Sequence, residues 1–304
     1  TGSVTYDAVT VSENNVRAAI RTGTDSLPAN NNFYFVLSPG RPVSVLVLQN
    51  DTADRGSSIY LTTVLGLSTA PRFATEVAAA SRVTAGQLGG RSLVVVNDAA
   101  LSSATADLLR AFVERGGGVF MALGDRNPAG SDWALMPGSL GAPVDRMAMR
   151  GGTLGYLDYS SPIFEEFKDP RNGNFANMRF LKYRTLTPAP SDHVLARFDD
   201  GAAALVERRV GSGRVIAFTS AIDGSWNDVP KHGMYLPLMH RLAQYLAQFD
   251  QPTPWETVGR MLDISTPVAA LVREGQAGAG GAGRARGARG VVVSPGGEQT
   301  SLGE

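Results

Sequence analysis

Cysteine is missing from this chain of 304 residues, and lysine is nearly so. The absence of cysteine excludes disulfides, thiolate nucleophiles, iron–sulfur clusters and zinc–thiolate sites together. It leaves the redox compartment open, because a protein without thiols tolerates either side of a membrane. Lysine occurs only at Lys168, Lys182 and Lys231, so few side chains could serve as a catalytic amine.

An excess of charge and long apolar segments are also missing. The 28 basic and 28 acidic side chains give a formal net charge of zero, which argues against a dedicated nucleic-acid-binding protein. Apolar runs such as Val43–Leu48 have the length of a strand, far below the ~20 residues that a membrane-spanning helix needs. No G-x-S-x-G sequence is present, so the usual nucleophile of an α/β hydrolase is absent as well.

From residue 41 onward, strand patterns alternate with helix patterns. Val43–Leu48, Ser92–Asn97 and Val119–Leu123 are continuous apolar runs, which are typical of parallel strands buried on both faces. Helix patterns occupy Ser57–Leu67 and Ala104–Arg115, and a strand–helix–strand unit forms a right-handed crossover. We therefore expect an α/β fold in which helices flank a mostly parallel open sheet. The other expected elements are strands at Phe73–Val77, Thr153–Tyr159, Arg179–Leu186, His193–Phe198, Ala203–Val210 and Arg214–Thr219, a helix at Met234–Phe249, and a loop over 127–150 with a short helix at Trp133–Met136.

Short β segments of neighbouring domains are expected at both ends of the chain. Strand patterns at Thr5–Val11 and Phe33–Leu37 precede the first α/β unit, and the chain stops inside a hairpin pattern that begins at Val291. Together with the missing initial Met, these segments predict a piece of a longer protein. The predicted regions are 1–40 (trailing β segment of an upstream domain), 41–250 (α/β domain) and 251–304 (linker, flexible Gly/Ala/Arg tract, and start of a further β domain).

Three carboxylates and a tryptophan are the candidate site residues. Asp98, Asp125 and Asp223 each follow a predicted strand, and open α/β sheets bind ligands at the carboxyl ends of their strands. Trp226 lies in the polar loop that Asp223 begins, where a D-x-S opening is similar to a metal-ion-dependent adhesion site. Asn227 replaces the second hydroxyl of such a site, so no metal ligand is assigned. The alternative is structural, because aspartates at strand ends often cap loops and helices.

Other motifs predict no cofactor and no catalytic group. The glycine-rich segment 278–283 matches G-x-G-x-x-G, but it does not lie between a strand and a helix, as a dinucleotide site requires. His193, His232 and His240 lack the spacing of a zinc site, so we interpret them as structural or surface residues.

The order of these elements resembles the class I glutamine amidotransferase-like fold, a flavodoxin-like arrangement. More narrowly, several short phrases are similar to large bacterial membrane proteins of the BatA type. Those proteins have an aerotolerance-regulator-like membrane anchor, a von Willebrand A-type domain and then an amidotransferase-like domain. The phrases are Phe33–Leu37, Phe198–Gly201, Val210–Val215 and Asp223–Asp228, within a resemblance that covers about residues 5–249.

The departures from an active amidotransferase shape the expected function. The resemblance places a nucleophilic cysteine just after the strand Val119–Leu123, where this chain has Gly124, and a catalytic histidine near Ser220–Asp223, where none occurs. Without a thiolate or an imidazole base, covalent glutamine hydrolysis has no chemistry available.

The leading hypothesis is therefore a non-catalytic domain of a membrane-anchored envelope protein with a structural or protein-interaction role. Its partners would be proteins or other domains of the same chain, on the periplasmic or extracytoplasmic side, and membrane association would come from parts outside this sequence. The alternatives are a module that binds a small ligand or carbohydrate at the strand carboxyl ends, and a metal-assisted hydrolase built on the same carboxylates.

Overall fold

The computed structural model describes residues 16–21, 31–37, 42–52, 55–127, 133–169, 171, 173–249, 291–293 and 299–301. The chain divides into two compact units, Gly40–Gln251 and a second unit made of Thr1–Pro39 with Pro252–Glu304. The predicted strand at Thr5–Val11 and the Gly/Ala/Arg tract lie outside the described residues.

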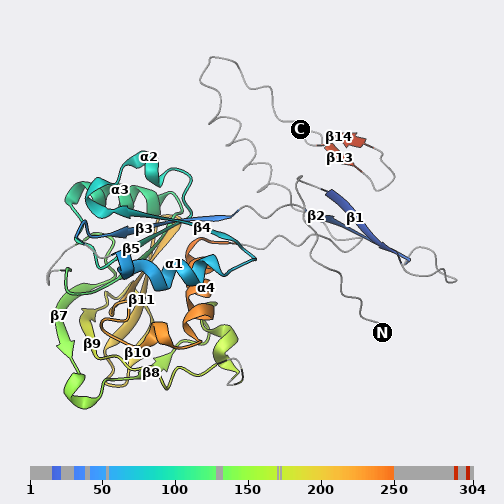
Figure 1. Ribbon diagram of the computed structural model, residues 1–304. Helices are drawn as coiled ribbons and strands as arrows, with labels where there is room; N and C mark the ends of the chain where they lie inside the picture. The colour runs from blue at the N-terminus through green and yellow to red at the C-terminus, as the bar shows by residue number, and fades with distance from the viewer. Residues whose placement is uncertain are drawn as a thin grey trace. The chain divides into compact units, whose positions relative to one another are not determined.

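A mixed sheet of eight strands forms the centre of the large unit (Figure 1). Its order is β4-β3-β5-β6-β12-β11-β10-β8; the first five strands are parallel, and the last three continue the sheet in antiparallel pairs. The strands are β3 (Val43–Gln49), β4 (Phe73–Ala79), β5 (Leu93–Asn97), β6 (Gly118–Ala122), β8 (Leu154–Leu157), β10 (His193–Phe198), β11 (Ala203–Val210) and β12 (Gly213–Phe218).

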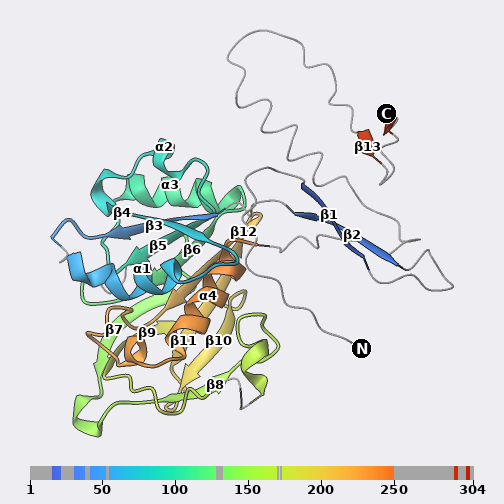
Figure 2. The same ribbon diagram turned by 45° about the vertical axis from the view of Figure 1, so that its right-hand side comes forward.

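Helices cover both faces of this sheet, as Figure 2 shows. Helices α1 (Ile59–Gly66) and α4 (Tyr235–Leu246) pack on one face, and α2 (Ala85–Leu88) and α3 (Ser103–Glu114) pack on the other. The strands serve both cores because successive side chains point to opposite faces. In β3, for example, Val45 faces α1 and α4, whereas Leu46 belongs to the core under α3.

The segment before β8 differs from the prediction. Part of the expected loop 127–150 is a strand, β7 (Ser139–Asp145), which pairs antiparallel with β9 (Lys182–Thr187) beside the main sheet. The expected short helix at Trp133–Met136 is a turn instead. The strand was not predicted because β7 has one buried side chain, Leu140, and therefore no alternating pattern.

The second unit contains two separate hairpins. Strand β1 (Val16–Arg21) pairs antiparallel with β2 (Asn32–Leu37), and β13 (Val291–Val293) pairs with β14 (Gln299–Ser301). Strand β2 and the terminal hairpin agree with the strand patterns at Phe33–Leu37 and from Val291, whereas β1 lies where no strand was predicted. Within the described parts of both units, no helix has the length and apolar character needed to cross a membrane.

Candidate functional site at the carboxyl edge of the sheet

Asp98 occupies the sharp turn that leads from β5 toward α3. Its backbone has a φ of +41°, a left-handed value that residues other than glycine rarely adopt. Its own N–H donates to the Ala122 carbonyl at 2.9 Å, which fixes the turn against β6. The resemblance places the amidotransferase nucleophile after β6. In the structure, the strand that leads toward a helix through a turn of positive φ is β5. Backbone strain of this kind is concentrated at functional sites.

The carboxylate of Asp98 is held by Arg126. The Arg126 backbone N–H donates to Oδ1 at 3.0 Å, and its guanidinium Nη1 lies 3.2 Å from Oδ2. Gly124 passes so close that a Cβ at this position would overlap the carboxylate. Burial raises the pKa of Asp98, and the contacts with Arg126 oppose this shift without cancelling it.

Asp125 and Trp226 come together, as expected for residues at one edge of the sheet. Lys182 Nζ donates to Asp125 Oδ1 at 2.6 Å, and Trp226 Nε1 donates to Oδ2 at 3.2 Å. The Lys182 ammonium also lies 4.5 Å from the centroid of the indole ring. The hydrogen bond from Lys182 holds the pKa of Asp125 below its ordinary value. Trp226 is buried, so its ring packs the loop onto the sheet.

Asp223 does not join this group through any contact among the described residues. Its Oδ1 accepts from the backbone N–H of Ser225 at 2.9 Å and from the Ser225 hydroxyl at 2.6 Å. It therefore caps its own loop, which was the structural alternative. Asn227 points inward and donates to Ser220 Oγ at 2.9 Å. In the described parts of the chain, no group of three or more His, Cys, Asp or Glu could hold a metal ion.

Arg184 is the central residue that sequence reasoning missed. This arginine of β9 is only 4% exposed, and its Nε donates to the Gly124 carbonyl at 2.9 Å and its Nη1 to the Gly141 carbonyl at 3.2 Å. Burial lowers its pKa, while the charges of Asp98 and Asp125 oppose that shift. The guanidinium therefore ties the loop after β6 to β7. The one signal in the sequence was a charged residue inside a strand pattern.

A second polar cluster was also missed, at the carboxyl ends of β3 and β5. The Gln49 side-chain oxygen accepts from Ser57 Oγ at 3.2 Å and from Ser58 Oγ at 2.9 Å. Asn97 Nδ2 donates to the Ser57 carbonyl at 3.0 Å. These bonds fix the start of α1 over the edge of the sheet.

The histidines are engaged away from Asp98 and Asp125. His240 Nε2 lies 2.6 Å from the Val64 carbonyl and joins α4 to α1. His193 Nε2 lies 3.0 Å from Asp158, and His232 pairs with Asp228 at 3.1 Å.

Comparison with known proteins supports the fold alone. No family model matches this chain, and no curated protein matches it. Two cytoplasmic proteins of Salmonella typhimurium, the second from strain LT2, align with TM-scores of 0.52 at 12% and 16% identity. Each alignment covers 67% of this chain and 98% or 99% of the other. A protein of Bacteroides uniformis ATCC 8492 described as ThuA-like aligns with a TM-score of 0.50 and 13% identity, over 69% of this chain and 93% of that one. The expected α/β architecture, a large sheet flanked by helices, is thereby confirmed.

Proposed function

We propose that this chain is a non-catalytic interaction domain of amidotransferase-like fold within a larger, membrane-anchored bacterial envelope protein of the BatA type. The likeness to a ThuA-like structure supports the amidotransferase-like assignment, and the phrases Phe198–Gly201 and Asp223–Asp228 support the BatA type. Its partners are other proteins, or other domains of the same chain, on the extracytoplasmic side. A membrane-spanning segment upstream of Thr1 in the full-length protein is the expected finding.

The observation that supports an interaction role is an exposed apolar surface on α1 and β4. Ile59 is 55% exposed and Leu67 is 61% exposed, and Tyr60 of α1 and Val77 of β4 are exposed as well, on two elements that pack against each other. Helices that are apolar on nearly every side are normally covered on every side. Contiguous apolar patches on soluble domains mark interaction sites.

Helix α3, on the opposite face, provides the contrast. Its buried apolar residues, Leu109, Phe112 and Val113, lie on one side, and its exposed side has polar residues such as Asp107 and Arg110. This is the ordinary pattern of a helix that meets solvent. The apolar exposure is therefore a property of α1 and β4 and not of helices throughout the domain.

The geometry of the carboxyl edge supports the non-catalytic part of the proposal. Covalent catalysis needs a nucleophile with a base in hydrogen-bond reach. Asp98 is paired with Arg126, and Asp125 is paired with Lys182 and Trp226. None of these pairs includes an imidazole.

Site-specific photo-crosslinking in the full-length protein tests the interaction role. A benzophenone amino acid at Leu67 or Val77 should give discrete adducts, and the same group at Arg110 on α3 should give none. Equal labelling from α1 and α3 would remove the observation on which the proposal depends. Glutamine or ester hydrolysis that disappears in Asp98→Asn would overturn the non-catalytic assignment.

The strained turn favours a second candidate function, binding of a small polar ligand beside Asp98. A ligand that binds the folded state should then raise the midpoint temperature of thermal unfolding. Calorimetric titration with Mg²⁺, Mn²⁺ and Zn²⁺ tests the remaining alternative, metal-assisted hydrolysis.

A further inference from the structure

Strand β8 forms one edge of the large sheet and, among the strands that the structure describes, pairs with β10 alone. The Asp158 N–H donates to the Leu195 carbonyl at 2.9 Å, toward β10. Alternate residues of an antiparallel strand direct their N–H and C=O groups to opposite sides. Leu157 therefore directs its backbone groups away from β10, where an added strand could pair with them.

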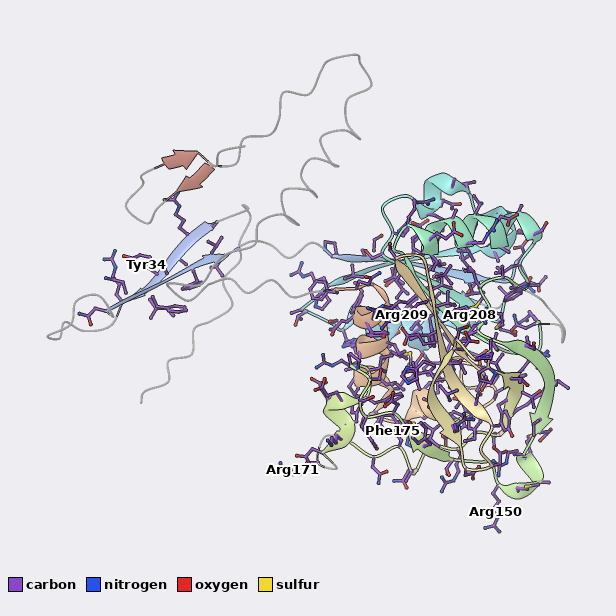
Figure 3. All side chains as sticks on the ribbon, turned by 180° about the vertical axis from the view of Figure 1, so that it is seen from behind. Tyr34, Arg150, Arg171, Phe175, Arg208 and Arg209 are labelled. Atoms are coloured by element: carbon purple, nitrogen blue, oxygen red, sulfur yellow. The ribbon has the colours of Figure 1, made fainter. Side chains whose placement is uncertain are left out.

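A groove of about 490 Å³ lies between this edge strand and residues 167–168 and 173–176. Figure 3 labels Phe175 and Arg171 on the same side of the domain. The volume of the groove falls within the range of about 300–1,000 Å³ that is typical of ligand sites. The lining residues are Leu154–Leu157, Tyr159, Phe167, Lys168, Gly173, Asn174, Phe175 and Ala176.

The groove has an apolar floor, an aromatic rim and a positive charge. Phe167 and Phe175 are buried and pack edge to face, with ring centroids 5.2 Å apart. Tyr156 is 48% exposed and Tyr159 is 41% exposed. Lys168 is exposed, and it is the one charged side chain among the described residues that line the groove.

We propose that this groove binds an extended, acidic peptide segment of a partner protein, which adds to β8 as a further strand. Main-chain hydrogen bonds supply affinity in this mode, and pockets for alternate side chains supply specificity. Apolar side chains of the peptide would face Phe167 and Phe175, and a carboxylate would meet Lys168. A register shift in the β8–β10 pairing between Arg197 and Phe198 limits the accessible edge to a short segment.

The lining favours a peptide over the other possible occupants. A sugar has no row of alternating N–H and C=O groups with which to pair the open edge of β8, and Asn174 Oδ1 is already engaged by the Ala176 N–H at 2.7 Å. A second copy of this chain would bring another β8 with its own Lys168, which provides no opposite charge. The groove follows β8, whereas the apolar surface of α1 adjoins β4 at the other edge of the sheet. The proposal therefore goes beyond the proposed function, and either can fail alone.

The test uses the full chain and a fluorescein-labelled, N-acetylated heptapeptide of alternating valine and glutamate. Fluorescence anisotropy should show saturable binding. Lys168→Glu should weaken it about tenfold, because the substitution converts an attraction into a repulsion. A peptide with lysine in place of glutamate should bind Lys168→Glu more tightly than it binds the unaltered chain. Lys231→Glu changes a lysine outside the groove and should bind like the unaltered chain.

Peptides N-methylated at alternate residues test the main-chain pairing. Methylation in one register removes the donors that face β8, and methylation in the other leaves them free. Only one of the two series should lose binding. No binding of the heptapeptide, equal binding of both methylated series, or displacement by a soluble hexasaccharide would each overturn the proposal. Sedimentation that shows a dimer broken by Lys168→Glu would assign the groove to a second copy and overturn it too.

Discussion

Arg184 provides the sharpest test of how the carboxyl edge is held together. The substitution Arg184→Met keeps a long apolar stem and removes the guanidinium. The carbonyls of Gly124 and Gly141 then lose the donors that lie at 2.9 Å and 3.2 Å. Asp98 and Asp125 also lose a nearby positive charge. The loop after β6 should therefore loosen from β7.

The expected loss of stability follows from these two bonds. Hydrogen bonds donated by a charged group contribute about 1.5–3 kcal/mol each, so two of them give about 3–6 kcal/mol. Removal of a buried charge recovers part of this sum, because a desolvated guanidinium is itself costly. We expect a net destabilisation of about 3 kcal/mol for Arg184→Met.

Urea unfolding measures this value, with an unchanged slope as the sign that only stability has changed. Arg184→Lys is the matched variant: it keeps the charge but cannot span both carbonyls as a planar fork does. It should lose about half as much. A loss below about 1 kcal/mol for Arg184→Met, or full rescue by Arg184→Lys, would refute the role assigned to the two hydrogen bonds.

Three further predictions concern single contacts within the large unit. Gly124→Ala should destabilise the domain by about 1–3 kcal/mol in thermal unfolding, because its Cβ overlaps the Asp98 carboxylate; Gly66→Ala, with open space around it, should be neutral or stabilising. The pKa of Asp98 is raised in the folded state, so ionisation of this carboxyl lowers the stability of the domain as pH rises from about 3.9 through the folded pKa. Asp98→Asn cannot ionise, so urea titrations should show its stability increasing relative to that of the unaltered chain over the same pH window. Tyr245→Phe removes the donor 2.8 Å from buried Glu207 and should cost about 1–2 kcal/mol in the same assay, and a neutral result would contradict that role.

The fold was predictable where local pattern and burial agree. Val43–Leu48 is apolar throughout because both faces of β3 are covered. Helix α3 begins where expected because Ser102 Oγ accepts the Thr105 N–H at 3.1 Å, and its apolar residues recur at helical spacing. Strand β7 was not predictable, since its pairing with β9 and not its own composition makes it a strand.

The site was predictable in position but not in the state of its side chains. The strand ends correctly placed Asp98 and Asp125 at one edge of the sheet. The partner of Asp125 is Lys182, which lies 57 residues further along the chain. The sequence did not indicate Lys182 as a site residue. Whether Trp226 meets solvent or packs under a loop depends on that same contact. Long-range pairings of this kind leave no local pattern.

The two kinds of surface on this domain differ in what a ligand must displace. At the carboxyl edge, a ligand for Asp98 must break the contacts with Arg126 at 3.0 Å and 3.2 Å, and a ligand for Asp125 must displace Lys182 and Trp226. Each exchange of one hydrogen bond for another yields little net free energy. On α1 and along β8, apolar side chains are exposed and, among the described residues, the outer edge of β8 has no strand partner, so a partner can bury them without displacing a charged group from its ion pair. This difference favours association with proteins over capture of small polar molecules.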